Sequence, residues 1–243
     1  MKNKKKVINT KDSLSLLNEK QKAQILRQIQ YHMDAPPFEN VQLNSVITLH
    51  MDIMPDVTRP MSSKGLAKWL WSNTDLYRNK KVLDIGTGCG IQGIVCLLGG
   101  AESVVFTDIM QAACKCAKNN LHKAGLENKG KIEMSDLFDT IKSKKIYDLI
   151  VFAQPYFSGK PISGYEFTRG MFDSEELQIR FFKEARKYLN TKGRILLMGW
   201  DFAGKKNSPT YIGPQYGFRI TKKDIYYDWV GVQQGEFQIL LFE

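Results

Sequence analysis

The stretch VLDIGTGCGIQGI, residues 82–94, decides the fold. It begins with the apolar segment of a buried strand and ends in an apolar segment that we expect to be helical. Between them lie three glycines at alternate positions, Gly86, Gly88 and Gly90. Glycine is needed where the backbone takes dihedrals that other residues avoid, or where a ligand approaches the main chain closely. In open α/β sheets the crevice at the carboxyl ends of the strands holds the ligand. The glycines therefore mark a candidate binding turn, with a purely structural turn as the alternative.

Strands and helices alternate after this stretch. Such alternation predicts an α/β fold with a doubly wound, mostly parallel sheet and helices on both of its faces. A short Gln-Gln-Gly link separates the last two strands, which we expect to form an antiparallel C-terminal hairpin at one edge. The seven predicted strands are 81–85, 103–107, 131–134, 147–153, 194–200, 220–230 and 235–242, and the predicted helices among them are 92–98, 111–124 and 174–189.

The N-terminal part lacks this alternation. The sequence predicts a helical and irregular extension over residues 1–75, followed by the main domain at 76–243. Prolines follow the first predicted helix and stop it, because proline cannot continue a helix. The predicted segments of the extension are disorder at 1–10, a helix at 13–33, extended or irregular chain at 38–60 and a second helix from Ser62 to Asn73.

Composition is that of an ordinary globular protein, with 243 residues and 43% hydrophobic side chains. It excludes a collagen-like repeat and a disulfide scaffold. The formal net charge of +10 invites a nucleic-acid or membrane-surface partner, although four of the charges are lysines at positions 2, 4, 5 and 6. We expect no membrane span, no secretory signal and no metal site, and four cysteines suit a reducing compartment. The expected location is therefore cytoplasmic.

Two acids follow the next strands in positions that suit a nucleoside. Asp108 ends the second strand, 24 residues after Asp84, and a carboxylate there can accept hydrogen bonds from both ribose hydroxyls. Asp136 follows the third strand, where it can accept a hydrogen bond from an adenine amino group. The alternative for each is a plain helix cap.

Together these residues resemble the class I S-adenosylmethionine-dependent methyltransferases, which have a Rossmann-like fold. The resemblance covers about residues 59–243 and implies S-adenosyl-L-methionine as the cofactor. It implies that the first-strand acid and the glycines hold the methionine portion, that the second acid holds ribose, and that the third holds adenine with a flanking apolar residue. The implied cofactor-binding residues are Asp84, Gly86, Gly88, Gly90, Asp108, Ile109, Asp136, Leu137 and Ala153.

Residues 153–156, AQPY, stand where the branch with release-factor glutamine and rRNA guanine methyltransferases has Asn-Pro-Pro-Tyr. In that branch the asparagine and a backbone carbonyl accept hydrogen bonds from the substrate amino group, and the tyrosine stacks on the planar target. Here Ala153 has no side-chain acceptor. Gln154 carries an amide, but adjacent side chains of an extended chain point to opposite faces.

The candidate catalytic residues are Tyr156, Glu166 and Asp201. Tyr156 is expected to wall the target site, with an ordinary packed aromatic as the alternative. Glu166 lies in the long loop after the fourth strand, where a substrate lid would sit, and solvent exposure is its alternative. Asp201 ends the fifth strand and suits a base or a cation site, with a turn or cap role equally open.

The sequence thus predicts a methyltransferase, and the acceptor stays open. A small-molecule or specialised N- or O-acceptor is favoured because the asparagine is absent and no RNA-binding module is appended. The alternatives are a macromolecular amine, in an RNA base or a protein glutamine, and a non-catalytic S-adenosylmethionine-binding protein. An arc of charge at Lys64, Lys160 and Arg169 around the site would favour a nucleic acid.

Overall fold

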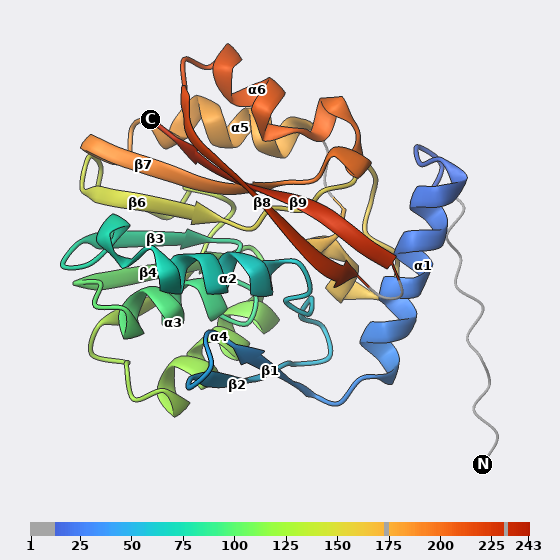
Figure 1. Ribbon diagram of the computed structural model, residues 1–243, viewed down its shortest axis with the longest axis horizontal. Coiled ribbons are helices and arrows are strands. Elements are labelled where there is room, and N and C mark those ends of the chain that lie inside the picture. Colours follow the sequence, from blue (N-terminus) through green and yellow to red (C-terminus); the bar gives the residue numbers. More distant parts are fainter. Residues whose placement is uncertain (1–12, 173–174, 231–232) are drawn as a thin grey trace.

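A seven-stranded sheet forms the centre of the protein, whose computed structural model describes residues 13–172, 175–230 and 233–243 (Figure 1). The strand order is β5-β4-β3-β6-β7-β9-β8. The first five strands in this order are parallel, whereas β9 is antiparallel to both β7 and β8. The predicted doubly wound fold with its C-terminal hairpin is confirmed. The strands are β3 (Lys81–Ile85), β4 (Ser103–Asp108), β5 (Gly130–Met134), β6 (Tyr147–Phe152), β7 (Leu189–Gly199), β8 (Ile220–Val230) and β9 (Gln233–Phe242).

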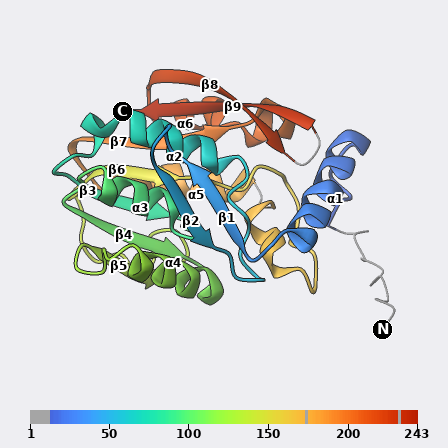
Figure 2. The same cartoon turned by 60° about the horizontal axis from the view of Figure 1, so that its bottom comes forward.

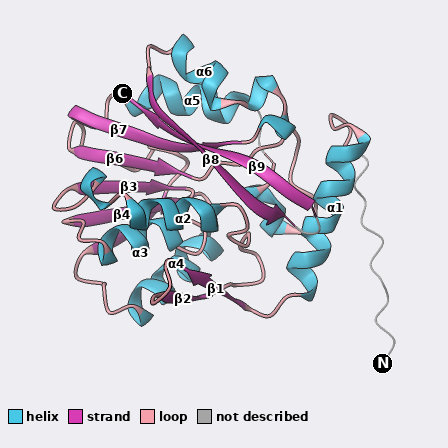
Figure 3. Ribbon diagram, in the orientation of Figure 1, coloured by secondary structure: helices cyan, strands magenta, loops and turns pink. Residues whose placement is uncertain are grey.

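Helices cover both faces of this sheet (Figures 2 and 3). Neighbouring residues of one strand enter different hydrophobic clusters, so that Val82 and Leu149 belong to one cluster and Leu83 and Ile150 to the other. Strands that are apolar on both faces are typical of sheets covered on both sides. The covering helices are α2 (Ser63–Ser72), α3 (Ile91–Leu98) and α4 (Gln111–Lys123) on one face, and α5 (Glu175–Ala185) and α6 (Pro209–Gln215) on the other.

The boundary between α5 and β7 differs from the prediction. The predicted helix extended to Leu189, but Leu189 is the first residue of β7 and lies opposite Tyr147 of β6. The pairing register shifts between Tyr147 and Leu149. This irregularity lets the strand begin five residues before the predicted Arg194 and shortens the helix accordingly. The predicted helix start at Ser174 lies outside the described residues.

The N-terminal helix α1 (Glu19–Asp34) begins later than predicted because a capping box fixes its start. Asn18 Oδ1 accepts from the Gln21 amide at 3.0 Å, and Gln21 Oε1 accepts from the Asn18 amide at 3.1 Å. The segment expected to be extended or irregular holds an antiparallel hairpin of β1 (Phe38–Gln42) and β2 (Thr48–Asp52). The disorder predicted for residues 1–10 falls outside the described chain.

A buried arginine fastens this hairpin and α1 to the loop before α2. The exposed fraction of Arg59 is 4%. Its Nη1 donates to Glu39 Oε1 at 3.1 Å and to the Phe38 carbonyl at 3.2 Å, and its Nη2 donates to the Ala35 carbonyl at 2.9 Å. Lys64 Nζ pairs with the other Glu39 oxygen at 2.7 Å. One guanidinium therefore joins three segments, which suits its fork of donors.

The extension also contacts the main domain through side-chain amides. Asn120 of α4 donates to the Asp52 carbonyl and accepts from the Asp52 amide, both at 2.9 Å. Gln21 Nε2 donates to the Phe202 carbonyl at 2.8 Å. α2, although inside the predicted extension, packs on α3 as part of the helical layer. The division after residue 75 stays a prediction.

Replacement of the buried guanidinium should destabilise the fold. For Arg59→Met we expect the free energy of unfolding to fall by about 3 kcal/mol, because buried carbonyls and a carboxylate lose their donors. Denaturant unfolding followed by circular dichroism measures this change. Arg78→Met is the control, since the exposed Arg78 side chain donates to the Thr74 hydroxyl at 3.1 Å, and its effect should stay within about 0.5 kcal/mol. Equal effects of the two variants would contradict the assignment.

Candidate active site

The turn after β3 takes a backbone form that requires glycine. Gly86, Gly88 and Gly90 have φ values of +59°, +56° and +89°, a region that residues with a Cβ rarely adopt. Gly90 precedes α3, and a Cβ there would approach the Ala117 backbone to 3.2 Å. A Cβ on Gly88 would meet nothing within 4 Å. The turn therefore opens onto free space at Gly88 and packs tightly against α4 at Gly90.

Asp84 stabilises this turn from below. Its exposed fraction is 1%, and its Oδ2 accepts from the Thr87 hydroxyl at 2.6 Å and from the Gly93 amide at 3.1 Å. Burial raises the pKa of Asp84 to about 7, and the Asp108 charge adds to this rise, whereas the two hydrogen bonds oppose it. The Asp84 side chain holds the two ends of the turn together and does not line the pocket above it.

Asp108 lies across the turn, at the end of β4. Its Oδ2 accepts from the Gly88 amide at 3.0 Å, and its Oδ1 accepts from the Met110 amide at 2.9 Å. Burial raises the pKa of Asp108, while these amides and the positive charge of Arg169 act in the opposite direction. The carboxylate lines the pocket, with one edge held by the backbone.

The third acid lies beyond β5. Asp136 lines the pocket, and its Oδ2 pairs with Arg180 of α5 at 2.9 Å. Leu137 follows with φ of +48°, a strained conformation for a residue with a side chain. Ile109, whose exposed fraction is 48%, lines the same region. The turns after β4 and β5 thus bring these predicted residues together.

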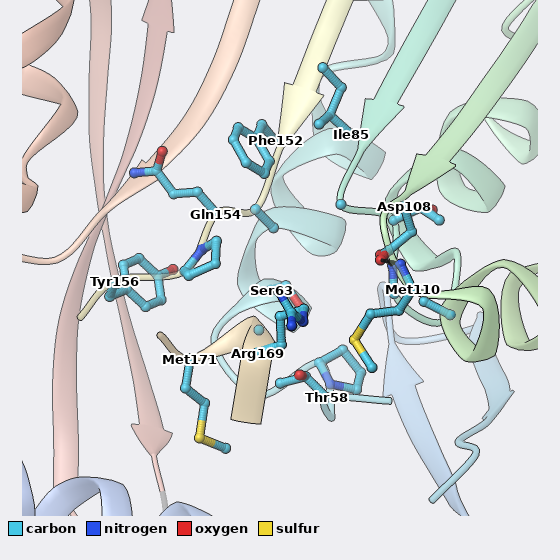
Figure 4. A pocket seen from close by; sticks show the side chains of 18 of the residues that line it. Thr58, Ser63, Ile85, Asp108, Met110, Phe152, Gln154, Tyr156, Arg169 and Met171 are labelled. Carbon is cyan, nitrogen blue, oxygen red and sulfur yellow. Dashed lines mark hydrogen bonds between the residues drawn. The ribbon is translucent and has the colours of Figure 1, made fainter. Parts of the chain in front are cut away.

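One pocket, with a volume of about 360 Å³, is bordered by Gly86, Gly88, Asp108, Ile109, Asp136 and Leu137 (Figure 4), whereas Asp84 and Gly90 lie outside its lining. We call the part of the wall formed by Gly86, Gly88, Asp108 and Asp136 the cofactor side. In the view of Figure 4, Tyr156 and Met171 lie across the pocket from Asp108. We call the wall around them the acceptor side, and it consists of Tyr156, Phe157, Met171, Trp200 and Phe237.

The acceptor side is built from packed aromatic rings. Tyr156 meets Trp200 edge to face with ring centres 5.6 Å apart, and Phe237 lies 4.8 Å from Trp200. The Tyr156 hydroxyl is 3.2 Å from the hydroxyl of Ser62. Burial raises the pKa of Tyr156 well above its usual value, so the hydroxyl stays neutral. This wall presents apolar surface and uncharged hydroxyls.

The altered motif turns its amide away from the pocket. Ala153 lines the pocket without any side-chain acceptor. Gln154 is 1% exposed, and its Nε2 donates to the Met198 carbonyl of β7 at 3.1 Å. Figure 4 shows its side chain directed towards the neighbouring strands. The Gln154 side chain therefore fixes the segment to the sheet and leaves the acceptor side without an amide from this motif.

Glu166 and Asp201 are not brought to the pocket. Glu166 begins the short helix η2 (Glu166–Gly170), is exposed and does not line the cavity. Asp201 follows Trp200, is also exposed, and its Oδ2 accepts from Gln238 at 2.7 Å. Both residues begin short 3-10 helices and lie outside the pocket lining, so neither is kept as a catalytic candidate.

The pocket lining includes charged and polar residues that were not among the predicted site residues. Arg180 lines the wall near the third acid, and nothing in its local sequence marks it. Arg169, which the sequence suggested only as part of a possible arc of charge, lines the wall near the second acid. Gln28 of α1 also lines the pocket. A signal existed for it, because Gln21 and Gln28 share the spacing of the buried residues of α1, where apolar side chains are expected.

No group of three or more His, Cys, Asp or Glu side chains in the described parts of the chain is placed to hold a metal ion. Across the same ranges, no helix combines the length and the apolar character that a membrane crossing needs. The four cysteines are free thiols. The cytoplasmic location stays a prediction.

Comparison with known proteins identifies relatives of this chain. The family model described as "Methyltransferase small domain" matches residues 61–208, which is more than half of the chain. A protein of Methanocaldococcus jannaschii named "Putative protein N5-glutamine methyltransferase" is 32% identical over 178 residues, covering 71% of this chain and 86% of that protein. Ribosomal RNA small subunit methyltransferase C of Buchnera aphidicola is 33% identical over 135 residues, covering 55% of this chain and 37% of that protein.

A solved structure supports the fold. The ribosomal protein L11 methylase of Lactobacillus delbrueckii subsp. bulgaricus superposes with a TM-score of 0.58 at 18% sequence identity. The match covers 84% of this chain and 98% of that one. At this identity the likeness concerns the architecture of the sheet and helices.

The pocket fits the S-adenosylmethionine cofactor that the family uses. The turn leaves open space at Gly88, whose φ is positive. Asp108 presents a carboxylate at the end of the strand next to it, as ribose hydroxyls require. The assignment of individual residues to parts of the cofactor is our proposal.

Removal of the Asp108 carboxylate should weaken cofactor binding. For Asp108→Ala we expect the affinity for S-adenosylhomocysteine to fall at least about tenfold, because two charge-assisted hydrogen bonds to ribose are lost. Isothermal titration calorimetry measures the change. Asp139→Ala is the control, since Asp139 is exposed and outside the pocket wall. Unchanged affinity in Asp108→Ala would remove this residue from the proposed ribose site.

Asp84 should make stability depend on pH. Its native pKa of about 7 lies above the ordinary value of 3.8, so the native protein binds more protons than the unfolded chain between these values. The stability from this group is therefore complete below about pH 4 and is lost as the pH rises through 7. Relative to Asp84→Asn, the wild-type free energy of unfolding should fall between pH 4.5 and 7.5 in urea titrations. A constant difference between the two proteins would exclude the raised pKa.

Proposed function

We propose, from the premise that the chain belongs to the methyltransferase small domain family and is an S-adenosylmethionine-dependent methyltransferase, that its acceptor is the side-chain amide of a protein glutamine. The enzyme assignment sets aside the non-catalytic alternative. The names of the relatives refer to protein and RNA substrates. They give no support to the small-molecule acceptor that the sequence favoured, and the macromolecular alternative fits better.

The choice of glutamine as the acceptor rests on one observation. The relative named for N5-glutamine methylation aligns along 71% of this chain and 86% of its own length. The relative named for ribosomal RNA shares a similar identity, but the alignment reaches only 37% of that protein. The larger shared length supports an acceptor of the first kind.

The charges around the pocket also argue against a polyanion. Lys64 is held by Glu39 at 2.7 Å. Arg169 lies near enough to Asp108 for its positive charge to oppose the rise of the Asp108 pKa, so this charge is close to the cofactor side. Only Lys160, of the three cations that would form an arc, is exposed without such an engagement among the described residues. Phosphate binding needs several accessible cations, and this rim offers few.

S-adenosylmethionine supplies an electrophilic methyl group: the acceptor nitrogen forms the new bond with its electron pair, the carbon–sulfur pair leaves with sulfur, and the nitrogen loses one proton. The protein contributes mainly by positioning. Asp108 and Asp136 would hold the adenosine portion on the cofactor side. The ring of Tyr156 would lie against a planar acceptor, and Trp200, packed edge to face with it, would help to exclude water. A neutral amide suits this uncharged wall, since an ammonium ion would lack a carboxylate partner there.

A labelling experiment tests this function. The purified protein is incubated with methyl-labelled S-adenosylmethionine and cell extract, and the products are divided by protease, nuclease and filtration. We expect label in the protease-sensitive fraction. Acid hydrolysis of that fraction should release labelled methylamine, because a methylated side-chain amide is cleaved to glutamate and methylamine, whereas methylated lysine keeps its label.

The Asp108→Ala variant serves as the control with weakened cofactor binding, and at a low concentration of S-adenosylmethionine it should transfer much less label than the wild type. Label in the nuclease-sensitive fraction would assign the enzyme to RNA. Label that passes the filter would support a small molecule as the acceptor and contradict the protein acceptor. Labelled protein that yields no methylamine would exclude glutamine as the acceptor.

A further inference from the structure

Gln28 of α1 is a buried polar residue that the proposed catalytic groups do not explain. Its exposed fraction is 5%, and it lines the pocket together with Asp108 and Tyr156. A buried amide costs free energy unless it is hydrogen-bonded. Among the described residues, no hydrogen bond engages the Gln28 side chain. Its amide is therefore available to a molecule in the pocket.

The other amides and carboxylates of the pocket wall have partners in the protein. Gln92 Nε2 donates to a backbone carbonyl of α2 at 2.9 Å, and Gln154 Nε2 donates to one of β7 at 3.1 Å. Asp136 pairs with an arginine, and Asp108 accepts from two backbone amides. Of these groups in the described chain, Gln28 alone keeps both its donor and its acceptor free.

The position of Gln28 on α1 fixes the direction of its side chain. Gln21, seven residues earlier, donates to the Phe202 carbonyl at 2.8 Å. His32, four residues later, stacks on Phe167 with ring centres 3.6 Å apart. Residues at these spacings share one face of a helix. Gln28 consequently faces the gap between the segments that contain Phe202 and Phe167.

Those segments border the acceptor side of the pocket. Phe202 stacks on Trp200 with ring centres 4.9 Å apart. The chain that follows Phe167 leads to Met171, whose carbonyl accepts from the Phe157 amide at 3.1 Å. Trp200, Met171 and Phe157 all belong to the acceptor side. The free amide of Gln28 therefore lies at the part of the pocket where the methyl acceptor would bind.

We propose that Gln28 binds the acceptor amide, an inference that rests on the proposed function. Its Oε1 accepts from the N–H of the acceptor, and its Nε2 donates to the acceptor carbonyl oxygen. Two amides are complementary in this way, each with one donor group and one acceptor group. The pair satisfies the buried Gln28 and fixes the plane of the acceptor, so that its nitrogen is oriented towards the cofactor side. The methyl side chain of Ala153 cannot form these hydrogen bonds.

Gln28→Met tests the proposal, because methionine has nearly the same length without hydrogen-bonding groups. We expect the rate of methyl transfer to protein in cell extract to fall roughly 10- to 100-fold, as when a buried hydrogen-bond partner is removed. The affinity for S-adenosylhomocysteine should stay within about twofold, since the contacts of α1 with Phe202 and Phe167 place Gln28 beside the acceptor side. Gln30→Met on the exposed face of the same helix is the matched control and should keep the wild-type rate.

A binding measurement gives a second readout that needs no turnover. The ¹⁵N-labelled protein, saturated with S-adenosylhomocysteine, is titrated with N-acetylglutamine methylamide as the probe. The side-chain amide signal that is missing from the spectrum of Gln28→Met identifies Gln28 in the wild type. We expect this signal to shift as the probe is added, while the signal assigned through Gln30→Met stays in place.

The outcomes separate this proposal from the proposed function. An unchanged labelling rate in Gln28→Met, or a Gln28 signal that the probe does not move, overturns the role of Gln28. Label in RNA overturns the glutamine acceptor, whether or not Gln28→Met slows the transfer. If the extract contains no acceptor, the titration alone decides the role of Gln28.

Discussion

The buried carboxylate of Asp84 is the constraint on which the binding edge depends. By accepting from Thr87 and Gly93, it ties the end of β3 to the first turn of α3. The chain between these points must then double back in a short loop, which the glycine conformations permit. That loop presents the Gly88 amide to Asp108. The orientation of the second-strand acid therefore follows from the first.

The sheet and the cofactor side follow from local patterns in the sequence. Buried parallel strands are short apolar runs, and the helices between them repeat at helical spacing. The acids of interest lie at strand ends, which topology brings to one edge. The largest misjudged strand boundary in the sheet is set by long-range pairing, at Leu189, whose partner Tyr147 lies 42 residues earlier in the chain.

The acceptor side was less predictable because it is assembled from segments far apart in the chain. The Arg59 guanidinium donates to backbone carbonyls of the segment that follows α1, and no periodic pattern in the sequence predicts such a contact. Glu166 and Asp201 were chosen by their place in loops, but loop position does not determine side-chain direction. The row of glutamines on α1 was visible in the sequence, yet its neighbours in space were not.

The contact between Gln21 and Phe202 joins residues that are 181 positions apart. During synthesis, α1 leaves the ribosome well before Phe202 and must wait for that later segment before this bond can form. The glycine turn and the acids of β4 and β5 need only the first 140 or so residues (about 60% of the length). On the growing chain, the cofactor half of the pocket can be assembled before the wall that selects the acceptor.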